Sequence, residues 1–221
     1  MISQTSLLFL DDLKNNNYRD WFQANQKRYD AYKKEYKQLA EAFIAEMSTG
    51  DSSLSHLEAK NCTFRINRDI RFSKDKSPYK TNMGIWMSAG NKNFNLAGYY
   101  IHIEKGASFI AAGLHQPEPL ELKKIRREID GFYEDLDAIV NDAEFKKLYG
   151  DLDRENILKT MPKGYEKDNP AIEFLKLKSF TATAKLSDKD IADKDFVKKT
   201  SKKLLVLKPL VEFLNRALTT E

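Results

Sequence analysis

Six cationic side chains lie close together in one segment of this sequence and are its clearest candidates for chemistry. The segment 65–80 contains only two acids, Asp69 and Asp75, so its surplus of four positive charges equals the formal net charge of the whole chain, +4. Arginine binds phosphate or carboxylate through two parallel hydrogen bonds, and lysine adds a point charge. We therefore predict a pocket for an anionic, phosphorylated group whose ligand-binding residues are Arg65, Arg68, Arg71, Lys74, Lys76 and Lys80.

Three side chains are candidates for a catalytic role. Asp69 lies within the basic segment, where its carboxylate can orient an arginine or exchange a proton with the ligand. Tyr79 adds a hydroxyl near the end of the same segment. His102 and Glu104 are two positions apart on an expected strand and so share a face, which lets the carboxylate orient the imidazole as a general base. The predicted catalytic residues are thus Asp69, Tyr79 and His102.

The basic segment also supports two other interpretations. It can be the contact face of a non-catalytic module that binds nucleic acid or a protein, or a salt-bridged crossover that fixes a sheet to a helix. A concave pocket lined by Arg68, Arg71 and His102 favours ligand binding, and a flat basic face favours nucleic acid. Arginines paired with acids inside the fold favour a structural role. A small anionic molecule is the expected partner, and nucleic acid is the alternative.

Metal and cofactor chemistry have no motif in this sequence. It contains no HExxH, CxxC, P-loop or GxGxxG pattern. His102 and Glu104 together offer two potential ligands, which are too few for a metal site. Cys62 is the single cysteine, so an intrachain disulfide is impossible. We expect no bound metal and no cofactor.

Helices are expected before the basic segment. Hydrophobic residues indicate a short helix over 7–13 and a long one over 18–47. In the long helix, large apolar residues mostly recur every three, four or seven positions, which places them on one face. Tyr29, Tyr32 and Tyr36 belong to this face, so we interpret them as core or groove-lining residues rather than as a platform for nucleic-acid bases.

The middle of the chain is typical of a β-sheet. Strands are expected over 63–66, 83–88, 99–104 and 108–113, and the short glycine-containing link 105–107 predicts an antiparallel hairpin. Side chains alternate along a strand, so one face of the first hairpin strand is buried. We expect the buried set to be Tyr99, Ile101 and Ile103, unless the register turns Tyr100 and His102 inward.

The remainder of the chain returns to helix. Helices are expected near 120–140 and 170–177, a short strand or an extended link over 179–184, and a final helix over 193–218 that Pro209 kinks or restarts. Helices at both ends with strands between them predict an α+β fold: a central, mainly antiparallel sheet flanked by N- and C-terminal helices. We expect residues 1–221 to form a single domain.

Composition places limits on the setting of this protein. Hydrophobic residues make up 41% of the 221 residues, which excludes a disordered polar chain. No apolar run approaches the length of a membrane span, and no basic and apolar leader is visible. We therefore expect a cytoplasmic protein without membrane contact, and the oligomeric state stays open.

Two groups of residues resemble a known family over about 7–218. The first comprises residues near the start of the long helix and most of the basic segment, and the second lies on the hairpin and beyond it: Asn16, Arg19, Trp21, Phe22, Asn25, Tyr29, the run from Phe64 to Thr81, Gly98 to Glu104, Gly113, and Pro162 to Gly164. This pattern resembles a family of conserved hypothetical proteins known as domain of unknown function 2461. The family has no established activity, so the resemblance implies no mechanism.

Overall fold

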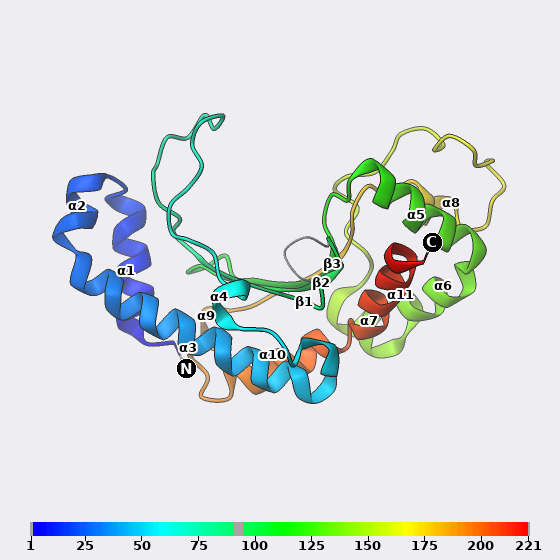
Figure 1. The fold of residues 1–221 in the computed structure, drawn as a ribbon. Helices are drawn as coiled ribbons and strands as arrows, with labels where there is room; N and C mark the ends of the chain where they lie inside the picture. Colours follow the sequence, from blue (N-terminus) through cyan, green and yellow to red (C-terminus); the bar gives the residue numbers. More distant parts are fainter. Residues whose placement is uncertain (1, 91–94, 221) are drawn as a thin grey trace. The chain divides into compact units, whose positions relative to one another are not determined.

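The computed structural model describes residues 2–90 and 95–220, which form two compact units (Figure 1). The first unit combines Met1–Met87, Tyr100–Ile110 and Lys185–Lys202, and the second combines the intervening segments with the C-terminus. Among the described residues, no helix is long and apolar enough to cross a membrane. The assignment of residues 1–221 to a single domain stays a prediction.

A four-stranded antiparallel sheet is formed by β1 (Met83–Ser88), β2 (Gly98–Ile103), β3 (Phe109–Leu114) and β4 (Phe180–Lys185), in the order β1-β2-β3-β4. The predicted hairpin is the pair β2 and β3. The expected register is also confirmed, because the exposed fraction is 0% for the three residues Tyr99, Ile101 and Ile103. The α+β class predicted from the sequence is therefore correct.

One expected strand does not form. In 63–66, Thr63 makes only an isolated antiparallel bridge to Ile85. The short helix α4 (Ala59–Cys62) ends immediately before it, and the chain then leaves the sheet as a long loop. The prediction was wrong because an apolar and β-branched run was treated as sufficient, whereas a strand also needs a neighbour along its length.

The long N-terminal helix is interrupted. The structure has α1 (Gln4–Asn15), α2 (Arg19–Ala24) and α3 (Gln26–Gly50) where the sequence suggested two helices. Asn25 separates α2 from α3, since its backbone departs from the helical conformation with φ −106° and ψ 19°, and its side-chain Nδ2 donates to the Trp21 carbonyl oxygen at 2.9 Å. Asparagine favours such local bonds over a continuing helix.

The predicted apolar face of α3 is buried, and Phe43 meets Phe196 of α10 (Phe196–Leu205) edge to face at 5.5 Å between ring centroids. The other helical segments of the first unit are η1 (Ser52–Leu54) and α9 (Asp188–Ala192). Ser187 caps α9 in a reciprocal arrangement with Asp190. This packing fixes the position of α3 within the first unit, and α3 forms one wall of the site described below.

The second unit consists of α5 (Pro119–Gly131), α6 (Tyr133–Asn141), α7 (Ala143–Tyr149), α8 (Ile172–Leu175) and α11 (Lys208–Thr219) with the neighbouring strand ends. Pro209 lies in the first turn of α11, so it starts a new helix rather than kinking a continuous one. Helix α11 packs against α5 and α6. Arg216 on α11 adds ion pairs to Glu128 at 2.5 Å and Asp135 at 2.9 Å.

Candidate functional site

The basic segment forms a long loop between α4 and β1, and its two arms pair with each other near their base (Figure 1). Asn67 and Tyr79 form an antiparallel bridge. The Arg68 N–H donates to the Pro78 carbonyl oxygen at 2.9 Å, and the Lys80 N–H donates to the Ile66 carbonyl oxygen at 2.7 Å. This pairing brings the start and the end of the segment together, 15 positions apart in sequence for Arg65 and Lys80.

Acids within the loop take up two of its arginines. The Arg71 guanidinium bonds the Asp69 carboxylate twice, from Nε at 3.0 Å and from Nη2 at 2.7 Å. Arg68 pairs with Asp75 and also donates to the Ser77 carbonyl oxygen at 3.1 Å. Hydrogen bonds from Ser77, then from Arg68, lower the pKa of Asp75 to about 2. These pairs shape the loop and leave less charge for a ligand.

The loop tip is open to solvent. The Lys76 ammonium donates to the Ile70 carbonyl oxygen at 3.0 Å, and Lys74 is exposed. Phe72 is 95% exposed, with the Arg71 guanidinium 5.8 Å from its ring centre. Three predicted ligand-binding residues, Arg71, Lys74 and Lys76, are therefore absent from the lining of the cleft described next.

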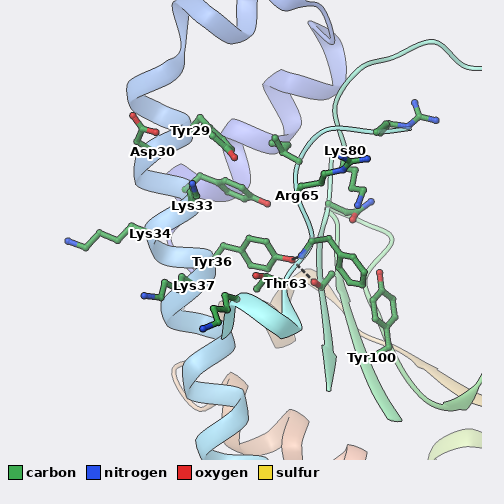
Figure 2. A pocket seen from close by; sticks show the side chains of 17 residues that line it. Tyr29, Asp30, Lys33, Lys34, Tyr36, Lys37, Thr63, Arg65, Lys80 and Tyr100 are labelled. Atoms are coloured by element: carbon green, nitrogen blue, oxygen red, sulfur yellow. Dashed lines mark hydrogen bonds between the residues drawn. The ribbon is translucent and has the colours of Figure 1, made fainter. Parts of the chain in front are cut away.

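A cleft of about 820 Å³ lies between α3 and the base of the loop (Figure 2). Its walls carry seven cationic side chains and a single carboxylate, that of Asp30. Five aromatic rings share these walls. The lining residues that the argument uses are Tyr29, Lys33, Lys34, Tyr32, Tyr36, Lys37, Lys60, Phe64, Arg65, Arg68, Lys80, Gly84 and Tyr100.

Arg65 and Lys80 lie near each other on the loop side of the cleft (Figure 2). Within residues 2–90 and 95–220, neither of them has an ion-pair partner. Partial burial, followed by the positive charge of Arg65, lowers the pKa of Lys80. The Lys80 ammonium also lies 4.9 Å from the centre of the Phe64 ring. The fold thus holds two cations together with no carboxylate of the described residues at ion-pair distance, although the Asp69 carboxylate interacts with Arg65 from farther away. An anion placed between the two cations would relieve their repulsion.

Helix α3 contributes the opposite wall, with Tyr29 and Tyr36 directed toward the segment that carries Thr63 (Figure 2). Lys34 points away from the cleft, and Lys37 is 3.6 Å from Glu41. On the loop side, Lys60 pairs with Glu58 at 2.6 Å. Lys33 lines the cleft without an ion-pair partner among the described residues, so it is the third cation available to a ligand.

The hydroxyl of Tyr36 fixes the two walls to each other. It donates to the Gly84 carbonyl oxygen and accepts from the Phe64 N–H at 3.1 Å. Burial raises the pKa of Tyr36 to about 12. Tyr32 is only 3% exposed and also lines the cleft, yet its hydroxyl makes no hydrogen bond in the described part of the chain. Among the described residues, this hydroxyl is not one of the fully buried polar atoms that lack a partner, so water or a ligand in the cleft can reach it.

Removing the Tyr36 hydroxyl is expected to destabilise the protein. In Tyr36→Phe, the partly buried Phe64 N–H loses its acceptor and the buried Gly84 carbonyl oxygen loses a donor, so the free energy of unfolding should fall by roughly 1–3 kcal/mol. Tyr32→Phe is the matched control, because its hydroxyl has no partner to lose, and its change should stay within about 0.5 kcal/mol. Urea denaturation measures both. Equal losses in the two variants would contradict the assigned role of Tyr36.

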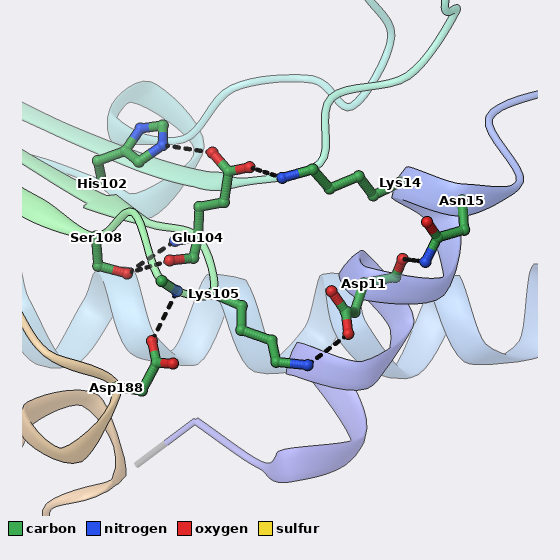
Figure 3. A network of polar contacts seen from close by, with 9 residues as sticks. Asp11, Lys14, Asn15, His102, Glu104, Lys105, Ser108 and Asp188 are labelled. Carbon is green, nitrogen blue, oxygen red and sulfur yellow. Dashed lines mark hydrogen bonds and ion pairs between the residues drawn. The ribbon is translucent and has the colours of Figure 1, made fainter.

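A chain of polar contacts runs from the cleft along β2. The Tyr100 hydroxyl lies 3.1 Å from His102 Nδ1, and His102 Nε2 lies 3.3 Å from the Glu104 carboxylate. Glu104 pairs in turn with Lys14 of α1 at 2.9 Å (Figure 3). His102 is stacked on Phe109 at 4.7 Å between ring centroids. The sequence pointed to His102 and Glu104, and the structure adds Tyr100 as the member that lines the cleft.

Tyr79 and Asp69 lie elsewhere. The Tyr79 ring stacks on Phe22 at 4.1 Å between ring centroids. Its backbone N–H donates to Asn17 Oδ1 at 3.0 Å, and Asn17 Nδ2 donates to its carbonyl oxygen at 2.9 Å. Neither Tyr79 nor Asp69 is among the described residues that line the cleft. Their catalytic roles stay predictions, and in this structure Tyr79 anchors the loop while Asp69 holds Arg71.

A family model for the conserved hypothetical proteins DUF2461 matches residues 5–213. The chain belongs to this family. The match covers the loop, the cleft and the polar chain on β2, and it confirms the resemblance seen in the sequence. Neither proteins of curated function nor solved structures gave a match.

Within this DUF2461 fold, the described residues contain no group of three or more histidine, cysteine, aspartate or glutamate side chains placed to hold a metal ion.

Sequence reasoning missed Lys33 and Lys60 as lining residues. A signal for Lys33 was present, because it follows Tyr29 by four positions in α3 and therefore lies on the same face of the helix. Lys60 had no comparable signal.

Proposed function

We propose that the cleft binds one small anionic, phosphorylated ligand, with Arg65, Lys80 and Lys33 as its principal contacts. The observation that carries the proposal is a concave site in which Arg65, Lys80 and Lys33 have no ion-pair partner among the described residues. Most surface charges either face water or pair with an acid, as Arg71 does with Asp69. In the cleft, Arg65 and Lys80 stay close together although they repel each other, and the Tyr32 hydroxyl can offer the ligand a further hydrogen bond.

The proposal extends to chemistry on the bound ligand. Tyr100 lines the cleft and is linked through His102 to Glu104, so a proton can pass between the ligand and this polar chain. His102 keeps the role of acid or base suggested by the sequence, and Tyr100 is the group that reaches the ligand. We also propose a cytoplasmic location, which the single buried cysteine Cys62 supports because no intrachain disulfide is needed.

Calorimetric titration with inorganic phosphate tests the proposal. The native protein should bind one phosphate per chain. Arg65→Ala and Lys80→Ala should each weaken binding by roughly tenfold to a hundredfold, the range for a hydrogen bond to a charged group. Neither variant should melt at a lower temperature by more than about 2 °C, because each change removes one member of a repelling pair.

Arg71→Ala is the matched control, since Arg71 belongs to the same segment but pairs with Asp69 outside the cleft. Its phosphate affinity should equal that of the native protein. Loss of binding in Arg71→Ala with none in Lys80→Ala would move the site to the loop tip. Binding of nucleic acid that weakens evenly with each lost cation, and steeply with salt, would support the interaction-module alternative instead.

A further inference from the structure

Phe64 leaves an aromatic surface open inside the cationic cleft. Its side chain is 46% exposed with the Lys80 ammonium already in place 4.9 Å from the ring centre. The Tyr100 ring meets it nearly edge on, with ring centroids 6.4 Å apart and planes at 75°. Lys80 therefore covers only part of Phe64, and the rest of the ring surface is accessible from the cleft.

The position of Phe64 is set by its neighbours. Its backbone N–H donates a hydrogen bond to the Tyr36 hydroxyl at 3.1 Å. The preceding residue, Thr63, forms an antiparallel β-bridge with Ile85 of β1. Gly84 makes room for the two rings, because a Cβ at that position would lie 2.7 Å from the Tyr100 hydroxyl oxygen and 3.3 Å from Phe64 Cδ2. The aromatic corner is thus built into the fold before any ligand arrives.

A simple phosphate would use only part of this site. The cleft volume of about 820 Å³ is in the range of small-molecule sites of roughly 300–1,000 Å³. Cations attract the anionic part of a ligand, and an accessible ring beside them offers a stacking surface for a flat group. Lys80 lies beside both regions, so a single ligand whose anionic part is close to a flat part can occupy them together.

We infer that the ligand is a nucleotide of mononucleotide size, with its phosphate on Arg65 and Lys80 and its base stacked on Phe64. This inference rests on the proposed function, because it assigns the phosphate to the same cations. It goes further by assigning the rest of the ligand to Phe64 and Tyr100, which no sequence motif indicated. Every base has a flat face, so stacking alone sets the class of ligand and not the identity of the base.

Four probes separate the two parts of the ligand: inorganic phosphate, ribose 5-phosphate, adenosine 5′-monophosphate and adenosine. Calorimetry at constant ionic strength should show the monophosphate binding roughly tenfold tighter than ribose 5-phosphate, as expected for one stacked base. In Phe64→Leu this difference should vanish while the affinity for ribose 5-phosphate is unchanged. Phe64→Trp should restore the difference, because tryptophan offers a flat ring again.

Phe72→Leu is the control, since Phe72 is 95% exposed on the loop tip and outside the cleft lining. It should bind all four probes as the native protein does. Equal affinity for the monophosphate and ribose 5-phosphate would overturn the nucleotide inference and leave the phosphate site intact. Failure of phosphate, ribose 5-phosphate and the monophosphate to bind would overturn both proposals. The inference would also be overturned if the tighter binding of the monophosphate than of ribose 5-phosphate persisted in Phe64→Leu but was lost in Phe72→Leu. That result would place the base at the loop tip.

Discussion

Replacing Gly113 by alanine is expected to remove a large share of the stability of this protein. Gly113 lies in β3 with φ +124°, a backbone conformation that favours glycine. An alanine Cβ would lie 1.9 Å from the carbonyl oxygen of Phe180 and 3.0 Å from the Cα of Thr181, both in the backbone of β4. The free energy of unfolding should fall by about 4 kcal/mol or more, against a typical total of roughly 5–15 kcal/mol.

Alanine substitutions at two other glycines distinguish the cost of the backbone conformation from the cost of the close contact with β4. Gly106 has φ +72° but open space around its Cβ position, so Gly106→Ala should cost only about 1–2 kcal/mol for the backbone conformation. Gly131 is the last residue of α5 and also has open space, so Gly131→Ala should be neutral or stabilise slightly. Urea denaturation of the three variants measures the series. If Gly113→Ala lost no more stability than Gly106→Ala, the close contact between β3 and β4 would be refuted.

Alkaline pH is expected to unfold the protein over a defined interval. Burial raises the pKa of Tyr36 from its ordinary value of 10 to about 12. Below pH 10 the phenol is protonated in both states, and its contribution to stability is fully present. Between pH 10 and 12 only the unfolded chain loses the proton, so the free energy of unfolding should fall by about 1.4 kcal/mol per pH unit, or roughly 3 kcal/mol in all.

Other buried groups act in the same direction. Burial raises the pKa of the Cys62 thiol to about 11, so its contribution is lost from about pH 9 upward. Burial also raises the pKa of Tyr32 and of Tyr149, which extends the loss at high pH. Urea denaturation at several pH values between 8 and 12 checks this profile.

Tyr36→Phe serves as the control for the alkaline profile. Its stability should be lower than that of the native protein at neutral pH, but the decline between pH 10 and 12 should be shallower by the share that Tyr36 contributes. A native protein whose stability is constant up to pH 12 would contradict the burial of these phenols. An unchanged slope in Tyr36→Phe would exclude Tyr36 as a source of the decline.

Local features of the fold could be predicted well from this sequence. The strand alternation around Ile101 and the glycine-containing link after Glu104 were sufficient to predict the β2–β3 hairpin and its buried face. The start of α11 was one of two options left open by Pro209. Predictions failed where an element depends on distant partners, as at 63–66, or on one side chain that bonds its own backbone, as at Asn25.

For the candidate site, the difference between what the sequence determines and what the tertiary structure decides is larger. Composition and spacing were enough to identify the basic segment and its surplus of positive charge, and the family was identified by the resemblance of its motifs. They could not show which cations pair with acids, because ion pairing depends on distances that the loop register and the position of α3 establish. Folding pairs Arg71 with Asp69 and leaves Arg65 beside Lys80. It also places these two cations opposite Tyr29 and Tyr36, which precede them by 29 to 51 positions. The charges are a property of the sequence, whereas their grouping around a cleft arises only when α3 and the loop pack against each other.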